Sequence, residues 1–151
     1  MEASSSDRRT RQTLIWLGAA EQRLATLVNR ALRGSDLPYA QFVVLSHLAS
    51  LPGEFWTVTA LAAAMETGQP GVSKILHRLA AKGLIQAAPD AGDGRIRRHR
   101  LTPAGEAAYR EAARRIAPLS HDIFTDWTET DIETLHTLLY RLKSSLHHHS
   151  P

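Results

Sequence analysis

Apolar residues recur at steps of three and four over both ends of the chain, and this spacing constrains the fold more than any other feature. Between Arg8 and Arg33 the apolar positions are Leu14, Leu17, Leu24, Leu27, Val28 and Leu32. Near the other end they are Ile132, Leu135, Leu139, Leu142 and Leu146. Charged residues separate them, which is typical of amphipathic helices. A chain with such ends must be mostly helical.

The middle of the chain, residues 37–102, predicts three shorter helices. Pro38 suits the first turn of a helix whose apolar side holds Phe42, Val43, Leu45, Leu48 and Ala49 and which stops at Pro52-Gly53. Phe55-Trp56 forms a short extended piece. Thr57 caps a second helix, which carries Val58, Leu61, Ala62 and Met65 and closes at Gly68. Pro70 begins a third, which ends at Gly83 and buries Val72, Ile75, Leu76 and Leu79.

A basic hairpin follows these helices. The turn formers of Pro89–Gly94 separate an apolar run at 84–88 from a returning strand at 96–101. Residues 69–100 hold seven Lys and Arg against two acids, an excess of five in a chain whose net charge is +3. The acids gather instead near the C-terminus, at Asp122, Asp126, Glu129, Asp131 and Glu133. The partner of residues 69–100 is therefore expected to be negatively charged.

Composition excludes several classes of protein. The chain has 151 residues and no cysteine, so disulfide frameworks, thiolate zinc sites and thiol chemistry are ruled out. It has no apolar run long enough to span a membrane, and its first eleven residues are polar and charged. We expect one soluble, cytoplasmic domain with no membrane partner.

A helix pair joined by a tight turn and followed by a basic hairpin has the parts of a helix-turn-helix with a wing. One helix would enter the major groove of double-stranded DNA, and the hairpin would follow phosphates or the minor groove. The alternative is that these basic residues are ordinary solvated surface.

Residues 37–105 resemble the multiple-antibiotic-resistance-regulator (MarR) family of winged-helix transcription factors. Leu61-Ala62, Val72-Ser73-Lys74, Leu79 and Lys82-Gly83-Leu84-Ile85 are similar to the family's helix pair and its exit into the wing. Asp93-Gly94-Arg95, Leu101-Thr102 and Gly105 are similar to its wing signature. The resemblance covers about half of the chain. Gly68-Gln69-Pro70-Gly71 departs from the family, in which small hydroxyl residues are common at this helix start.

The resemblance implies the residues that touch DNA. Arg95 would lie at the wing tip and reach the minor groove, with Asp93 holding its guanidinium; the bland alternative is a surface ion pair of little energy. The whole implied set is Ser73, Lys74, His77 and Arg78 on the recognition helix, and Asp93, Arg95, Arg97 and Arg98 on the wing.

The flanking helices are expected to form a homodimer. Trp127 and Ile132 bracket Thr128 and Asp131 with the spacing of a hydrophobic staple around a capping box, so the final helix should begin near Thr128. Its apolar seam could pack within its own chain or against a partner subunit. The resemblance favours the partner, with residues 37–102 as the DNA-binding lobe and 8–36 and 103–146 as the dimerisation lobe. Residues 1–7 and 147–151 are expected to be disordered tails.

The resemblance also implies a pocket between the two lobes for a small aromatic or lipophilic effector. Candidate lining residues are Trp16, Tyr39, Phe42, His47 and Tyr109, although aromatic residues at helical spacing are more often core. No cofactor is expected. The eight histidines show no metal-ligand spacing, and His147–His149 could bind nickel or zinc only adventitiously.

The predicted function is a sequence-specific DNA-binding transcription regulator. It would be a ligand-responsive repressor that binds a pseudo-palindromic operator as a homodimer, with half-sites one helical turn apart. Catalysis is not expected, because Ser73 and His77 lie one turn apart without an orienting acid or an oxyanion hole. The alternative is a winged-helix module that binds another protein.

Overall fold

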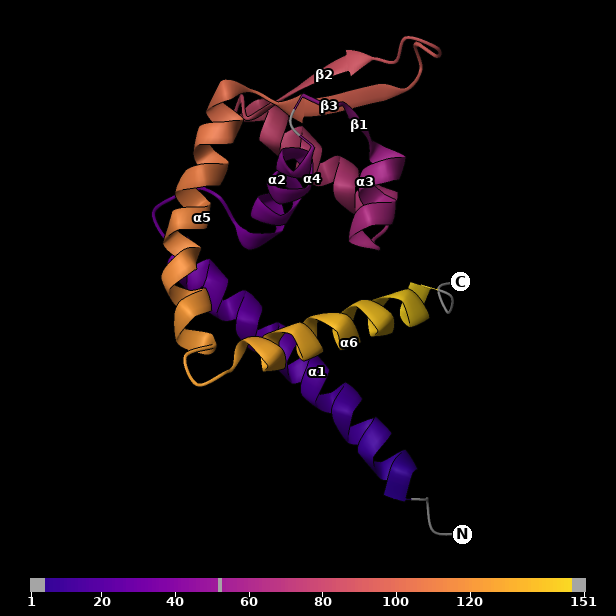
Figure 1. Ribbon diagram of the computed structural model, residues 1–151. Coiled ribbons are helices and arrows are strands. Elements are labelled where there is room, and N and C mark those ends of the chain that lie inside the picture. Colours follow the sequence, from indigo (N-terminus) through magenta and orange to yellow (C-terminus); the bar gives the residue numbers. More distant parts are fainter. Residues whose placement is uncertain (1–4, 52, 148–151) are drawn as a thin grey trace.

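The computed structural model describes residues 5–51 and 53–147, which form a mostly helical chain with one small antiparallel sheet (Figure 1). The predicted fold class is thereby confirmed. The elements in chain order are α1 (Ser5–Ala31), α2 (Tyr39–Ser50), β1 (Trp56–Thr57), α3 (Val58–Met65), α4 (Gln69–Ala81), β2 (Ile85–Pro89), β3 (Arg97–Leu101), α5 (Pro103–Ile123) and α6 (Glu129–His147).

The core of the molecule lies where α2, α3 and α4 meet the sheet. Leu45, Leu61 and Leu79, one from each of these helices, have no exposed surface. Burying a leucine completely contributes roughly 1.5–3 kcal/mol to folding, so these contacts fix the orientation of the helix pair. The other buried apolar residues of this part are Val44, Leu48, Ala62, Val72, Leu76 and Ile85.

The sheet has three strands in the order β1-β3-β2, all antiparallel. β2 and β3 form the predicted hairpin, with Ile85 opposite Leu101 and Pro89 opposite Arg97. β1 adds a third strand, in which Trp56 lies opposite His99. This pairing joins the start of α3 to the middle of β3 and so connects the helix pair to the hairpin.

A close backbone approach joins the hairpin to α5. The Thr102 amide donates to the Leu84 carbonyl at 3.1 Å, and the Thr102 hydroxyl donates to the Gly83 carbonyl at 2.7 Å. That hydroxyl also caps α5 by accepting from the Gly105 amide at 3.1 Å. A side chain at Gly105 would place its Cβ 1.9 Å from the Leu84 oxygen. The Leu101-Thr102 and Gly105 signature therefore has a structural explanation, since only glycine fits this contact.

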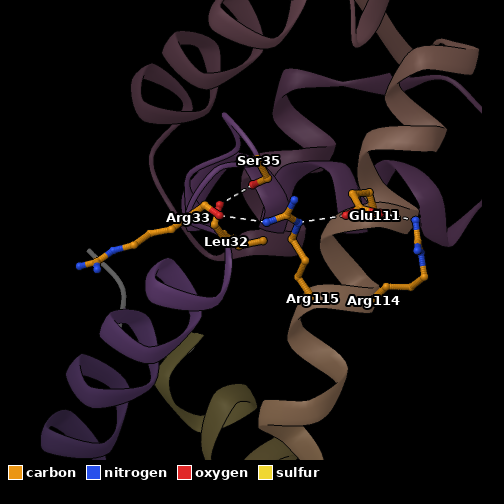
Figure 2. Close-up of polar contacts among 6 residues, drawn as sticks. All are labelled: Leu32, Arg33, Ser35, Glu111, Arg114 and Arg115. Carbon is orange, nitrogen blue, oxygen red and sulfur yellow. Dashed lines mark hydrogen bonds and ion pairs between the residues drawn. The ribbon is translucent and has the colours of Figure 1, made fainter.

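An arginine on α5 fastens this helix to the loop that follows α1 (Figure 2). Arg115 donates to the Arg33 carbonyl at 2.9 Å, and its Nε donates to Glu111 at 3.0 Å. Arg114 forms a second ion pair with the same glutamate. The Ser35 hydroxyl donates to the Leu32 carbonyl within the loop at 2.6 Å. These contacts hold the end of α1 against the middle of α5.

The first helix begins at Ser5, three residues before the predicted Arg8, and its first half stands away from the core. Of its predicted apolar stripe, Val28 and Leu32 are buried, whereas Leu14 and Leu24 are exposed. The stripe is therefore covered only near its C-terminal end. Residues 5–7 and His147 are helical, so the prediction of disordered tails is wrong for them. The tail predictions for residues 1–4 and 148–151 lie outside the described residues.

The last helix begins where its capping box predicts, and it extends through His147. The Asp131 amide donates to the Thr128 hydroxyl at 3.1 Å, and the Thr128 amide donates to the Asp131 carboxylate at 3.0 Å. Hydrogen bonds from Thr128 lower the pKa of Asp131 below its usual range. Trp127, the expected staple residue, packs edge-on against Phe124 at 5.4 Å between ring centres. α6 then runs back below the helix pair, as Figure 1 shows.

The apolar seam of α6 lies open along most of its length. Ile132, Leu139 and Leu146 are exposed, and Leu138 and Tyr140 beside them are exposed as well. Leu135 and Leu142 are half-buried. Among the described residues, no helix is long and apolar enough to cross a membrane.

Candidate nucleic-acid interface

The helix pair α3–α4 is joined by a three-residue turn. The Thr57 hydroxyl accepts from the Ala60 amide at 3.1 Å and caps α3, as predicted. α3 ends at Met65, and Glu66 takes the left-handed conformation at its C-cap. The prediction that Gly68 closes α3 is wrong. Gly68 is instead the N-cap of α4 and has no side chain to bond the first amides, so this cap is weaker than a serine or threonine cap.

The fourth helix has one buried face and one exposed face. Val72, Leu76 and Leu79 are buried, while Ile75 is half-buried. The four residues predicted to face DNA, Ser73, Lys74, His77 and Arg78, are all exposed. No ion pair reaches Lys74 or Arg78 from residues 5–51 or 53–147. This face therefore presents uncompensated positive charge to solvent.

The wing turn is organised by Asp90. Its carboxylate accepts from the Gly92 amide at 2.9 Å and from the Asp93 amide at 3.1 Å. These two bonds, together with the charge of Arg98, lower the pKa of Asp90 below its usual range. The Asp90 amide donates to the Ile96 carbonyl at 2.8 Å and closes the turn. These hydrogen bonds therefore give the turn at the tip of the wing a defined shape.

Asp93 has a different role from the one implied by the resemblance. Its carboxylate accepts from the backbone amide of Arg95 at 3.0 Å, so it stabilises the turn beside the arginine. The expectation that Asp93 holds the Arg95 guanidinium is corrected accordingly. No ion pair reaches the Arg95 side chain from the described part of the chain, and the residue is exposed at the tip.

Arg97 and Arg98 are neighbours in sequence and point to opposite faces of β3, because side chains alternate along a strand. His99 and Leu101, two and four residues beyond Arg97, face the core, which places Arg97 on the same side. Arg98 lies opposite Ala88 on the outer side, where its guanidinium pairs with the Asp90 carboxylate. The two arginines therefore differ in the charge they offer to DNA.

Arg100 also lies on this outer side, and the sequence interpretation did not include it among the site residues. Its guanidinium stacks over the Phe55 ring at 4.6 Å from the centroid. Gln86, directly opposite in the register, accepts from two of its nitrogens once its amide is oriented to satisfy both groups. A cation stacked on an aromatic ring is favourable. The sequence could have indicated this position, because Arg98 and Arg100 alternate with His99 along the strand and therefore share one face of it.

A cavity of about 450 Å³ opens behind the wing, between the end of α2, the sheet and the start of α5. This volume lies within the range of small-molecule sites. Its lining includes Leu48, Glu54, Arg100, Glu106 and Tyr109. Polar and apolar groups therefore both reach the space.

Of the five residues proposed for an effector pocket, only Tyr109 lines this cavity. Phe42 stacks against the Tyr109 ring at 5.7 Å and belongs to the packing between α2 and α5. Trp16 lies on the exposed first half of α1, where 65% of its surface is exposed, and it does not line the cavity. Tyr39 packs against the hydrophobic core. Partial burial lowers the pKa of His47, and the nearby charge of Lys143 lowers it further. The structure thus does not bring these five residues together.

Ser73 and His77 both lie on the exposed face of α4. Within the described residues, no group of three or more His, Asp or Glu side chains could hold a metal ion. The prediction for His148 and His149 lies outside these residues.

The helix pair with its capped turn, the exposed basic face of α4 and the three-stranded sheet with its long hairpin define a winged helix-turn-helix protein. Residues 35–96 match the sequence model of the MarR family. This match spans the helix pair and most of the wing, and so most of the residues that carry the resemblance seen in the sequence.

Solved structures extend the likeness to nearly the whole chain. The transcriptional regulator BldR from Sulfolobus solfataricus is 23% identical with a TM-score of 0.81, covering 94% of this chain and 99% of that one. A mutant of MarR from E. coli, complexed with operator DNA, is 22% identical with a TM-score of 0.76, covering 93% and 99%. BpsR of Bordetella bronchiseptica, whose DNA binding is regulated by 6-hydroxynicotinic acid, is 25% identical with a TM-score of 0.77, covering 87% and 98%.

Proposed function

We propose that this protein is a ligand-responsive transcription regulator that binds double-stranded operator DNA. The observation that carries the proposal is the exposed face of α4, where Ser73, Lys74, His77 and Arg78 lie beside the wing and receive no ion pair from the described residues. Lysine and arginine on a helix of this size can reach guanine edges and phosphates in the major groove. Arg95 and Arg97 would extend the contact along the wing.

The distribution of charge supports DNA as the partner. The bases of residues 69–100 lie on α4 and the hairpin, and the acids at 122–133 lie at the corner between α5 and α6. A duplex would meet the basic end and be repelled by the acidic one. A winged helix that bound another protein would instead need an apolar or acidic face on α4.

The apolar seam of α6 and the exposed half of α1 support a homodimer. Contiguous apolar patches on soluble chains mark interaction sites, and a second copy supplies a complementary seam by two-fold symmetry. A dimer would present two α4 helices to a pseudo-palindromic operator, with half-sites about one helical turn, or roughly 34 Å, apart. Repression would follow from occupancy of a promoter.

The cavity behind the wing is the best-supported place for an effector. It contacts the sheet through Arg100 and the dimerisation part through Tyr109. A ligand seated there would touch both parts, as a molecule that changes DNA binding must. BpsR, a protein of the same fold, responds to a small aromatic acid.

Arg95→Ala tests the DNA-binding proposal. Removing one phosphate contact should weaken operator binding and reduce the slope of log affinity against log salt by about 1 per wing. The measurement is a salt-titrated binding assay with duplexes from the upstream region of the gene and an unrelated duplex. Arg23→Ala, which removes an exposed arginine on α1, is the charge-matched control.

Unchanged affinity and slope in Arg95→Ala would remove this arginine from the interface. Equal, weak binding of the wild type to every duplex would favour the protein-binding alternative.

A further inference from the structure

The wing carries an acid that neutralises one of its own arginines. Asp90 and Arg98 lie on the same outer side of the hairpin, because Arg98 is opposite Ala88 and Asp90 is two residues further along. Such diagonal neighbours are within reach of long side chains. The Asp90 carboxylate and the Arg98 guanidinium form an ion pair there.

In this ion pair the carboxylate of Asp90 is fixed more firmly than the guanidinium of Arg98. The side chain of Asp90 is 16% exposed, while that of Arg98 is 45% exposed. Both oxygens of Asp90 are engaged, one by the Gly92 and Asp93 amides and the other by Arg98. The carboxylate therefore cannot turn away from Arg98 without breaking the turn.

Other arginines of the hairpin differ in this respect. Arg95 and Arg97 are exposed and receive no ion pair from the described residues. Arg100 is oriented by the uncharged Gln86 and Phe55. Arg98 alone among these four has its charge balanced within the described part of the chain.

We propose that Asp90 restrains Arg98 and thereby lowers the affinity of the wing for DNA of any sequence. A cation that is already paired releases no counter-ion when it approaches a phosphate, so it adds nothing to the sequence-independent part of binding. Asp90 is thus a positioning residue that sets how much of the wing's charge is available. The consequence is that the protein binds less tightly to the many non-operator sites that surround an operator. This inference rests on the DNA-binding function proposed above.

Asp90→Asn is the informative variant. The asparagine oxygen can still accept from the Gly92 and Asp93 amides, so the turn is retained, but the charge that holds Arg98 is lost. We expect tighter binding to a non-operator duplex at low salt and a salt slope steeper by about 0.9 per wing. Between 50 and 200 mM salt, each freed arginine should add about a further 3.5-fold loss of affinity.

Three further variants complete the experiment. Arg98→Gln should leave the salt slope at its wild-type value, and Asp90→Asn with Arg98→Gln should return it there. Asp122→Asn, an exposed acid at the far end of α5, raises the net charge equally and should not change the slope. Circular dichroism of each variant confirms that the fold is retained.

A slope that falls by about 1 in Arg98→Gln and stays unchanged in Asp90→Asn would overturn the inference, because Arg98 would then contact DNA in spite of its partner. Unchanged slopes in both single variants would overturn it as well. In both cases the wild type still binds DNA, so the proposed function stands. A wild type with no salt-dependent binding to any duplex would overturn both proposals together.

Discussion

Leu79 on α4 and Leu139 on α6 are both leucines at helical spacing, yet their surroundings differ completely. Leu79 has no exposed surface, whereas Leu139 is 42% exposed. The helix pair and the sheet bury their apolar residues within one chain, and α6 and the first half of α1 do not. The same periodicity thus means a finished core in one region and an exposed apolar surface in the other.

The two regions also differ in charge and in what they can bind. The region that has completed its core carries the exposed basic residues of α4 and the wing tip. The region with open apolar seams carries the acids at the corner between α5 and α6. DNA and a second subunit would therefore use different surfaces of the molecule.

The largest expected effect is in the finished core. Leu79→Ala should lower the free energy of unfolding by about 2–5 kcal/mol, because it leaves a cavity between α4 and the neighbouring helices. Denaturant titration at several protein concentrations measures it. The loss should be the same at every concentration. A loss below about 1 kcal/mol would show that this core is less tightly packed than the structure indicates.

The next effect belongs to the open seam. Leu139→Asp places a charge in the surface that we expect a second subunit to cover, and it should weaken the dimer by about 2 kcal/mol or more, roughly thirtyfold in dissociation constant. Sedimentation equilibrium measures the change. Thr137→Asp, which adds the same charge at an exposed position outside the seam, is the matched control. Equal masses for both variants and the wild type would mean that the seam has no partner subunit.

The smallest expected effect is a pH dependence of the free energy of unfolding, which arises from a histidine in the region with the finished core. His99 lies buried on the core side of β3, and this burial lowers its pKa, with Arg97 contributing, against a hydrogen bond that the imidazole donates to the Trp56 backbone, which raises it. Below about pH 6.5 the unfolded chain therefore binds a proton that the folded protein does not. Unfolding should become easier as the pH falls through that value, and the effect should vanish above it.

His99→Gln should flatten this pH dependence. Urea titrations of both proteins between about pH 5.5 and 8, a range that spans the ordinary histidine pKa, compare them. The difference at the upper end, where His99 is neutral in both states, reports packing alone. A steep pH dependence that survives in the variant would assign it to other groups, of which His47 is one with a pKa lowered by burial.

Much of the local structure could be predicted from sequence because its causes are local. Thr57 caps α3 and the Thr128–Asp131 pair caps α6 through bonds between residues three apart. The exposed face of α4 follows from its periodicity. These features depend on spacing along one helix, which a sequence shows directly.

Contacts across the fold could not be predicted in the same way. The sequence places Asp90 and Asp93 near several arginines, and only the strand register decides that Asp90 pairs with Arg98. Likewise, the Phe42–Tyr109 stack joins two residues that were candidates for the ligand pocket implied by the family resemblance. Aromatic side chains can fill a core or line a cavity, and the tertiary fold makes the choice.

The hydrogen bond from Arg115 to the Arg33 carbonyl holds α5 at one point, so α5 can tilt about that point like a lever about its pivot. From Arg115 back to Pro103 the helix spans about 18 Å, so a tilt of about 5° at the pivot shifts its first turn by about 1.6 Å. That first turn is bonded to the base of the wing through Thr102. A slight change in how two subunits lean on each other would thus be transmitted to the spacing of their wings.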